Sequence, residues 1–188
     1  MNSTAMAYEA ALRPLSAVVD AVPVDDWDRP SPCSDWTARD VVAHIIATQR
    51  DLLVGHGHDL GAMPDLSDPA AGLRSHADRV LGLVSRAQVV DVTYEGFFGT
   101  TTVGATLVQF YVWDMLVHRW DIARAAGGDE TLTPAELDRI EAGANRFGDA
   151  LHMEGICGPA VSPPAGAGRQ VELLGRLGRD ASGANGQP

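Results

Sequence analysis

The chain has 188 residues, about the size of one ordinary domain, and its 45% hydrophobic content is sufficient for a single substantial core. Its 25 acidic and 14 basic residues give a formal net charge of -11 at pH 7, which repels nucleic acids and anionic lipid surfaces. All 14 basic residues are arginine, which excludes a lysine Schiff base, and the two distant cysteines form neither a disulfide framework nor a thiolate metal motif.

Apolar residues recur at mostly helical spacing over residues 4–22 and predict the first helix. Pro14 lies inside this helix, and we expect it to bend or interrupt the helix because proline cannot donate a backbone hydrogen bond. The next segment, residues 25–35, is polar and contains proline. We expect Trp27 within it and Trp36 just after it to fold back onto the core.

The second helix is predicted to begin after Thr37, because Thr37 and Asp40 have the spacing of a capping box. It carries His44 two turns in and should fray in the glycine-rich residues 55–58. A third helix is predicted over residues 68–86, which open with Asp-Pro, an N-cap followed by a first-turn proline.

Residues 89–106 are rich in Thr, Gly and aromatic side chains, and they could form either an irregular loop or a short hairpin. A fourth helix over residues 107–126 is the most apolar, and Gly127-Gly128 should end it. A fifth helix over residues 133–151 opens with a second capping box.

The carboxy-terminal part should consist of a proline-rich connector over residues 158–168, a short amphipathic helix over residues 171–177 and a disordered tail over residues 181–188. We therefore expect one domain over residues 1–180, with an all-α fold. Amphipathic helices with short connections favour a four-helix bundle with additions. No run of roughly 18 apolar residues could span a bilayer and no secretory signal precedes the first helix, so we expect a cytoplasmic protein with no membrane or nucleic-acid partner.

Asp114 and His118 are four residues apart on the fourth helix, so their Cβ atoms should lie about 5–6 Å apart on one face. Carboxylate and imidazole both bind divalent first-row metals, and His44 on the second helix could supply a third ligand. The alternatives are a hydrogen-bonded core histidine and a simple helix-surface ion pair. Asp121 could replace Asp114 as a ligand, or it could orient a ligand by contacting it without binding the metal itself.

Four segments together resemble a known family: PCSDWTARDVVAH (residues 32–44), DMLVHRWDIAR (residues 114–124), CGPAV (residues 157–161) and LLGRLGRD (residues 173–180). They are similar to the DinB-like superfamily, in particular its actinobacterial branch related to the metal-binding domain of mycothiol-dependent maleylpyruvate isomerase. The resemblance covers nearly the whole chain. It implies a DinB-like four-helix bundle with a short additional carboxy-terminal helix.

In that family a histidine of the second helix binds the metal together with an acidic residue and a histidine four positions apart on a later helix. The resemblance therefore implies that His44, Asp114 and His118 bind one divalent ion, with zinc or nickel expected. The acidic ligand of the isomerase is a glutamate, where this chain has the shorter Asp114.

The resemblance also implies an activity, a transferase or isomerase reaction that uses mycothiol or another low-molecular-weight thiol. The expected partners are then a small thiol, an electrophilic substrate and, in a homodimer, a second copy of the chain. Maleylpyruvate isomerisation itself is not expected, because the isomerase has a further carboxy-terminal domain for which residues up to 188 leave no room. A metal-dependent hydrolase and a non-catalytic stress-response module that binds a metal and a small ligand are the alternatives.

Other candidate side chains give weaker signals. Cys33 precedes a helix start, where the dipole could lower the pKa of a thiol, but a buried structural cysteine is the simpler interpretation. His56 and His58 lie in a glycine-flanked loop and are expected to be exposed rather than to line a site. His76 and His152 are interpreted as ordinary residues of a helix or helix end.

Overall fold

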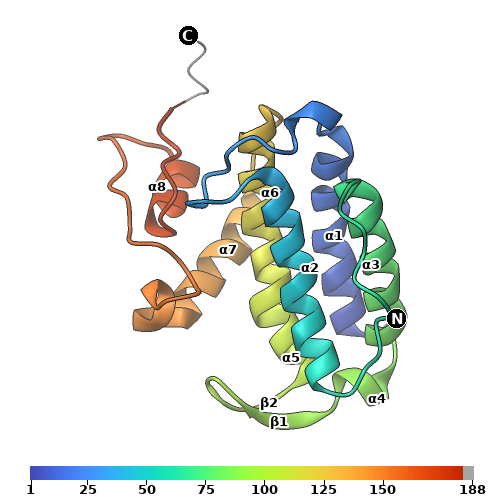
Figure 1. The fold of residues 1–188 in the computed structure, drawn as a ribbon. Coiled ribbons are helices and arrows are strands. Elements are labelled where there is room, and N and C mark those ends of the chain that lie inside the picture. Colours follow the sequence, from blue (N-terminus) through green and yellow to red (C-terminus); the bar gives the residue numbers. More distant parts are fainter. Residues whose placement is uncertain (184–188) are drawn as a thin grey trace.

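The computed structural model describes residues 1–183 and shows a four-helix bundle (Figure 1). The bundle helices are α1 (Ser3–Ala21), α2 (Ala38–Gly55), α3 (Pro69–Val84) and α6 (Trp113–Ala126). Helix α1 packs against α3 and α6, and α2 also packs against these two helices. One hydrophobic cluster extends from Ala5 in α1 to Leu177 near the carboxy terminus. The predicted all-α bundle with a short carboxy-terminal helix is confirmed.

Helix α1 runs through Pro14, so of the two effects expected of this proline, a bend or an interruption, the interruption does not occur. The side chain of Asn2 caps the helix by accepting a hydrogen bond from the amide of Ala5. Tyr8, Leu15 and other residues on one face are fully buried against the bundle. Burial of this face outweighs the loss of one backbone hydrogen bond.

Helix α2 is capped as its sequence predicts. The carboxylate of Asp40 accepts a hydrogen bond from the amide of Thr37 at 2.9 Å, and the hydroxyl of Thr37 accepts one from the amide of Asp40 at 3.2 Å. The reciprocal bonds fix where the helix begins, and therefore where His44 lies along it. Before this start, the indole of Trp27 is buried in the core as expected, while Trp36 is only partly buried.

Residues 93–102 form a β-hairpin, which decides between the two interpretations of this segment. Strands β1 (Thr93–Gly96) and β2 (Gly99–Thr102) are antiparallel, and Gly96 pairs with Gly99 across a turn made by Phe97 and Phe98. Gly99 has a φ of 100°, a conformation that side-chain-bearing residues rarely adopt. The short helix α4 (Ala87–Val90) leads into the hairpin, which projects from one end of the bundle (Figure 1).

The predicted fourth helix is continuous but not uniform. It begins with α5 (Val103–Thr106), continues as the π-helical segment η2 (Leu107–Val112) and becomes α-helical in α6. A π-helical segment changes the rotational position of every later side chain, and such segments occur frequently at functional sites. Asp114 follows this segment closely, so η2 sets the direction in which Asp114 points.

The carboxy-terminal part packs beside the bundle. It contains α7 (Pro134–Phe147), the 3-10 helix η3 (Gly148–His152) and α8 (Arg169–Arg176), while a further 3-10 helix, η1 (Val24–Asp26), follows α1. Helix α7 ends earlier than predicted, where Gly148 adopts a φ of 54°. Residues 181–183 of the predicted tail have no regular secondary structure, and residues 184–188 lie outside the described residues. None of the described helices combines the length and the hydropathy needed to cross a membrane.

Candidate metal centre

The structure brings together the three residues that the sequence singled out. His44 extends from α2, and Asp114 and His118 extend from α6. Nε2 of His44 lies 3.3 Å from Oδ2 of Asp114, and Nε2 of His118 lies 3.1 Å from Oδ1 of the same carboxylate. One carboxylate therefore lies between two imidazoles.

This arrangement fits one divalent ion. One donor atom from each of the three residues lies within 4.8 Å of the other two. Donors bound tetrahedrally at about 2.1 Å from an ion are about 3.4 Å apart, close to the two distances given above. Two imidazoles and a carboxylate are ligands that zinc and nickel accept. The residues present therefore fit the metal that the resemblance implies.

The carboxylate of Asp114 is in direct contact with both imidazoles, and the charges of this centre shift the pKa values of Asp114 and His118. Burial favours the neutral carboxyl of Asp114, but His118 and His44 outweigh this effect and hold its pKa well below the usual value. Burial likewise favours a neutral His118, yet the carboxylates of Asp114 and Asp121 raise its pKa well above 6.5. Without a metal, a protonated His118 thus lies between two carboxylates at neutral pH.

Asp121 supports His118 from the other ring nitrogen. Its Oδ2 lies 2.8 Å from Nδ1 of His118, and its side chain is fully buried. Burial opposes ionisation, but the charges of Arg179 and His118 lower the pKa of Asp121 to about 2. Because this carboxylate can only accept hydrogen bonds, Nδ1 of His118 must carry a proton, and Nε2 is the nitrogen that can bind a metal.

Arg179 compensates the buried charge of Asp121. Its Nη2 donates to Oδ2 of Asp121 at 3.0 Å and its Nε donates to Oδ1 at 3.3 Å, in a bidentate arrangement. A third bond, from Nη1 to the carbonyl oxygen of Leu177 at 2.8 Å, fixes the guanidinium. Burial would lower the pKa of Arg179, but Asp121 outweighs it and raises that pKa further above its usual value.

The two cysteines lie beside the same guanidinium. The thiol of Cys33 donates to Oδ2 of Asp121 at 3.3 Å, and its Sγ lies 3.5 Å from Nη2 of Arg179. Sγ of Cys157 lies 4.0 Å from Nη1, and burial raises the pKa of the Cys157 thiol despite this neighbour. Cys33, His118 and Asp121 are close enough to form a second metal-ligand set. The positive charge of Arg179 repels a cation from that position, which favours the first set.

A cavity of about 780 Å³ opens beside the metal centre. His44 and Asp114 belong to its lining, together with residues of the β1–β2 hairpin. The indole of Trp36 packs on two of the candidate ligands, with its ring centroid 4.7 Å from that of His44 and 6.1 Å from that of His118. An ion held by the three residues would therefore have coordination positions accessible from the cavity.

The remaining histidines have structural contacts. His56 and His58 are half-buried, so the exposure expected of these two side chains is wrong; the ring of His56 lies 4.3 Å from that of Tyr94. His76 is fully buried and hydrogen-bonds to Gln49 at 3.0 Å. The histidine at the end of η3, His152, is exposed and its Nδ1 lies 2.7 Å from a backbone carbonyl oxygen.

The role of Arg179 does not follow from the sequence patterns, although this residue lies in residues 173–180, one of the segments that resemble the family. A fully buried Asp121 requires a cationic partner, and arginine is the only strongly basic residue type in the composition. This requirement indicates that an arginine pairs with Asp121. It does not show which of the 14 arginines does so.

Comparison with known proteins identifies the family. Residues 8–123 match the model of the mycothiol maleylpyruvate isomerase N-terminal domain. Two uncharacterised proteins of Mycobacterium tuberculosis, from strains CDC 1551 / Oshkosh and ATCC 25618 / H37Rv, are each 28% identical over 144 residues, which cover 69% of this chain and 70% of the relative. No solved structure gives a significant match. The matched region contains all three candidate ligands and most of the bundle, and the chain belongs to the mycothiol maleylpyruvate isomerase N-terminal domain family.

Proposed function

We propose that this protein binds one divalent metal ion, zinc or nickel, through His44, Asp114 and His118, and that it is a thiol-dependent transferase or isomerase. Its co-substrate would be mycothiol or another low-molecular-weight thiol, and its substrate an electrophile. The observation that carries this proposal is that two of the three ligands, His44 and Asp114, line a cavity large enough for a small-molecule substrate.

A divalent ion bound here would stabilise a thiolate and so make a strong nucleophile near neutral pH. Other side chains of the protein would orient the ligands and shield them from water. Asp121 holds Nδ1 of His118 protonated and the imidazole in a fixed orientation, and Arg179 keeps Asp121 ionised. Trp36 packs on the ligand rings, which limits the approach of water from its side. Reactants can then meet the ligands from the cavity.

Metal content of the purified protein is the first test. We expect about one metal ion per chain, measured by mass spectrometry after purification without a chelating column, and a sharp loss in His44→Ala, Asp114→Ala and His118→Ala. His152→Ala, which removes an exposed histidine, is the matched control and should retain the metal. A parent protein that contains no metal and takes up neither zinc nor nickel would contradict the proposal.

Activity is tested on the loaded protein. Mycothiol and other small thiols are supplied with a panel of electrophiles, and loss of free thiol or formation of isomerised product is followed over time. Turnover that disappears in the three ligand variants supports an enzyme. Saturable ligand binding without turnover over long incubation supports the non-catalytic binding module, which the size of the cavity also favours.

The hydrolase alternative is less favoured by the geometry. It needs a second carboxylate near the metal that can steer a water molecule, and Asp121, which hydrogen-bonds to His118, is the candidate. Asp121 is fully buried behind His118, pairs with Arg179 and is not among the described residues that line the cavity. A carboxylate whose pKa is about 2 is also a weak general base.

A further inference from the structure

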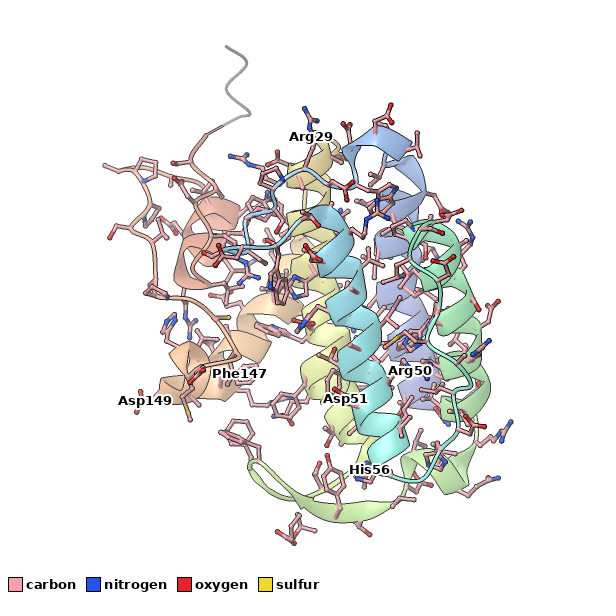
Figure 2. The ribbon with its side chains drawn as sticks, in the orientation of Figure 1. Arg29, Arg50, Asp51, His56, Phe147 and Asp149 are labelled. Atoms are coloured by element: carbon pink, nitrogen blue, oxygen red, sulfur yellow. The ribbon has the colours of Figure 1, made fainter. Side chains whose placement is uncertain are left out.

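The cavity beside the metal centre is walled by aromatic rings. All four phenylalanines of the chain line it: Phe97, Phe98, Phe110 and Phe147. Phe110 and Phe147 meet edge to face with ring centroids 5.3 Å apart, and the ring of Phe98 lies 6.0 Å from that of Phe110. Figure 2 shows Phe147 at the end of α7 that lies nearest to the hairpin. These side chains come from three separate segments and form one surface.

Two of these rings are unusually exposed. Phe97 is 63% exposed and Phe98 is 51% exposed, at the turn of the hairpin. Met153, which also lines the cavity, is 51% exposed. Large apolar side chains grouped at the mouth of a cavity typically mark a binding surface for an apolar ligand. A ligand that covers these three side chains would remove their apolar area from water.

The charges around the cavity are mostly of one sign. Within residues 1–183, the acidic residues that line it are Glu95, Asp114 and Glu154, and the one basic side chain is His44, which contacts Asp114. Among the described residues, none of the 14 arginines lines the cavity, and the chain contains no lysine. Away from the metal centre, an anionic ligand would therefore meet no cationic side chain in this lining and would enter against the field of the acidic residues.

We infer that the electrophile taken by this cavity is an aromatic compound without a negative charge. This inference rests on the proposed function and names its substrate class. The aromatic body of the ligand lies among the phenylalanines, and its reactive group lies beside His44 and Asp114. A carboxylate on the aromatic body is disfavoured, because its charge has no counterpart among the side chains of the lining and only the metal itself would compensate it.

The test compares two probes that share one ring system, 1-naphthylmethanol, which is neutral, and 1-naphthoate, which is anionic. Binding is measured by isothermal titration calorimetry on metal-loaded protein and on protein dialysed against a chelator. The metal-free comparison is decisive, because a carboxylate could also bind directly to a metal. We expect the neutral probe to bind at least about ten-fold more tightly than the anion to the metal-free protein.

Variants locate the site. Phe98→Ala, at an exposed position that should not affect folding, is expected to weaken binding of the neutral probe several-fold. Glu154→Arg, at another exposed position, should strengthen naphthoate binding and so reduce the preference for naphthylmethanol over naphthoate. Glu9→Arg makes the same charge change at an exposed position of α1 outside the cavity lining. It should leave the preference for naphthylmethanol over naphthoate unchanged.

Equal or tighter binding of naphthoate by metal-free protein would overturn the inference, and so would failure of the neutral probe to bind. The proposed function fails separately. If the protein takes up no metal but still prefers naphthylmethanol, the cavity assignment stands and the thiol chemistry does not.

Discussion

Nδ1 of His118 lies 2.8 Å from the buried carboxylate of Asp121, while Nε2 of the same ring faces Asp114. This places a proton on Nδ1 and leaves Nε2 as the nitrogen available to a metal. Asp121→Asn preserves the shape of the side chain but removes its charge. We expect it to lower metal affinity about 10- to 100-fold, measured by competition with a chromogenic chelator. Asp25→Asn, at an exposed position of η1, should not alter affinity. Equal affinities for Asp121→Asn and the parent would show that Asp121 does not support the ligand.

Metal binding should release a proton. Asp114 and Asp121 raise the pKa of His118 well above 6.5 against the effect of burial, so the metal-free protein holds His118 protonated at pH 7. Because a metal binds only deprotonated Nε2, about one proton per ion should leave at about pH 7. Calorimetric titrations in buffers of different ionisation enthalpy measure this number. Binding heats that do not depend on the buffer would contradict proton release. The Asp121→Asn variant should release fewer protons per metal ion than the parent.

Removal of Arg179 should destabilise the fold. Arg179→Met keeps most of the apolar stem but removes the guanidinium that compensates the buried carboxylate of Asp121, which we expect to cost about 3 kcal/mol of the free energy of unfolding. Urea denaturation measures the change. Arg169→Met removes an arginine from exposed ion pairs with Asp138 and Glu141 and should have a much smaller effect. Addition of Asp121→Asn to Arg179→Met should recover part of the loss, since the buried charge that Arg179 compensated is then gone.

Stability should fall below neutral pH because of His76. Burial, together with Arg50 and Arg79, lowers the pKa of His76 to about 4 in the folded protein, against 6.5 for an unperturbed histidine. The unfolded chain therefore binds a proton that the folded chain does not, and stability is lost as pH falls from 6.5 towards 4. From about pH 7.5 to about pH 5 this residue should contribute a loss of about 2 kcal/mol. Urea denaturation of His76→Asn should show a smaller loss across this range, whereas His152→Asn, at an exposed position, should behave as the parent does.

Gly143 gives room to Trp113, the residue before Asp114. A Cβ added at Gly143 would lie 2.1 Å from Cδ1 of Trp113, whose Nε1 donates to the carbonyl oxygen of Ile140 at 2.9 Å. Gly143→Ala should therefore cost about 1–3 kcal/mol of stability and weaken metal binding by moving α6 against α7. Gly82→Ala, in an open position of helix α3, should instead stabilise the protein by about 0.5–1 kcal/mol. Thermal unfolding of both variants distinguishes a specific contact from a general effect of alanine.

The helices and the common face of Asp114 and His118 were predictable because both depend on local spacing. The approach of His44 to these two residues, from α2, was implied only by the resemblance. Residues four apart on a helix share a face in any helix, which placed Asp114 and His118 together before the fold was known. The pairing of Asp121 with Arg179 was not predictable, because 58 residues separate them and no periodicity relates α6 to the segment after α8.

Two further features depended on geometry that residue patterns do not carry. The π-helical residues of η2 are as apolar as those of a buried α-helix, so nothing in them indicated the change of pitch. The half-buried state of His56 follows from its contact with Tyr94 in the hairpin, which exists only once β1 folds against the end of α2.

The ion pair between Asp121 and Arg179 can form only late during synthesis of the chain. A ribosome makes the three candidate ligands and Asp121 well before it makes Arg179, which follows Asp121 by 58 residues. A nascent chain can therefore assemble the bundle while the carboxylate behind His118 still has no arginine to neutralise it. Docking of α8 and the residues after it completes the electrostatics of the centre, so a segment that is synthesised late finishes the interior of the protein.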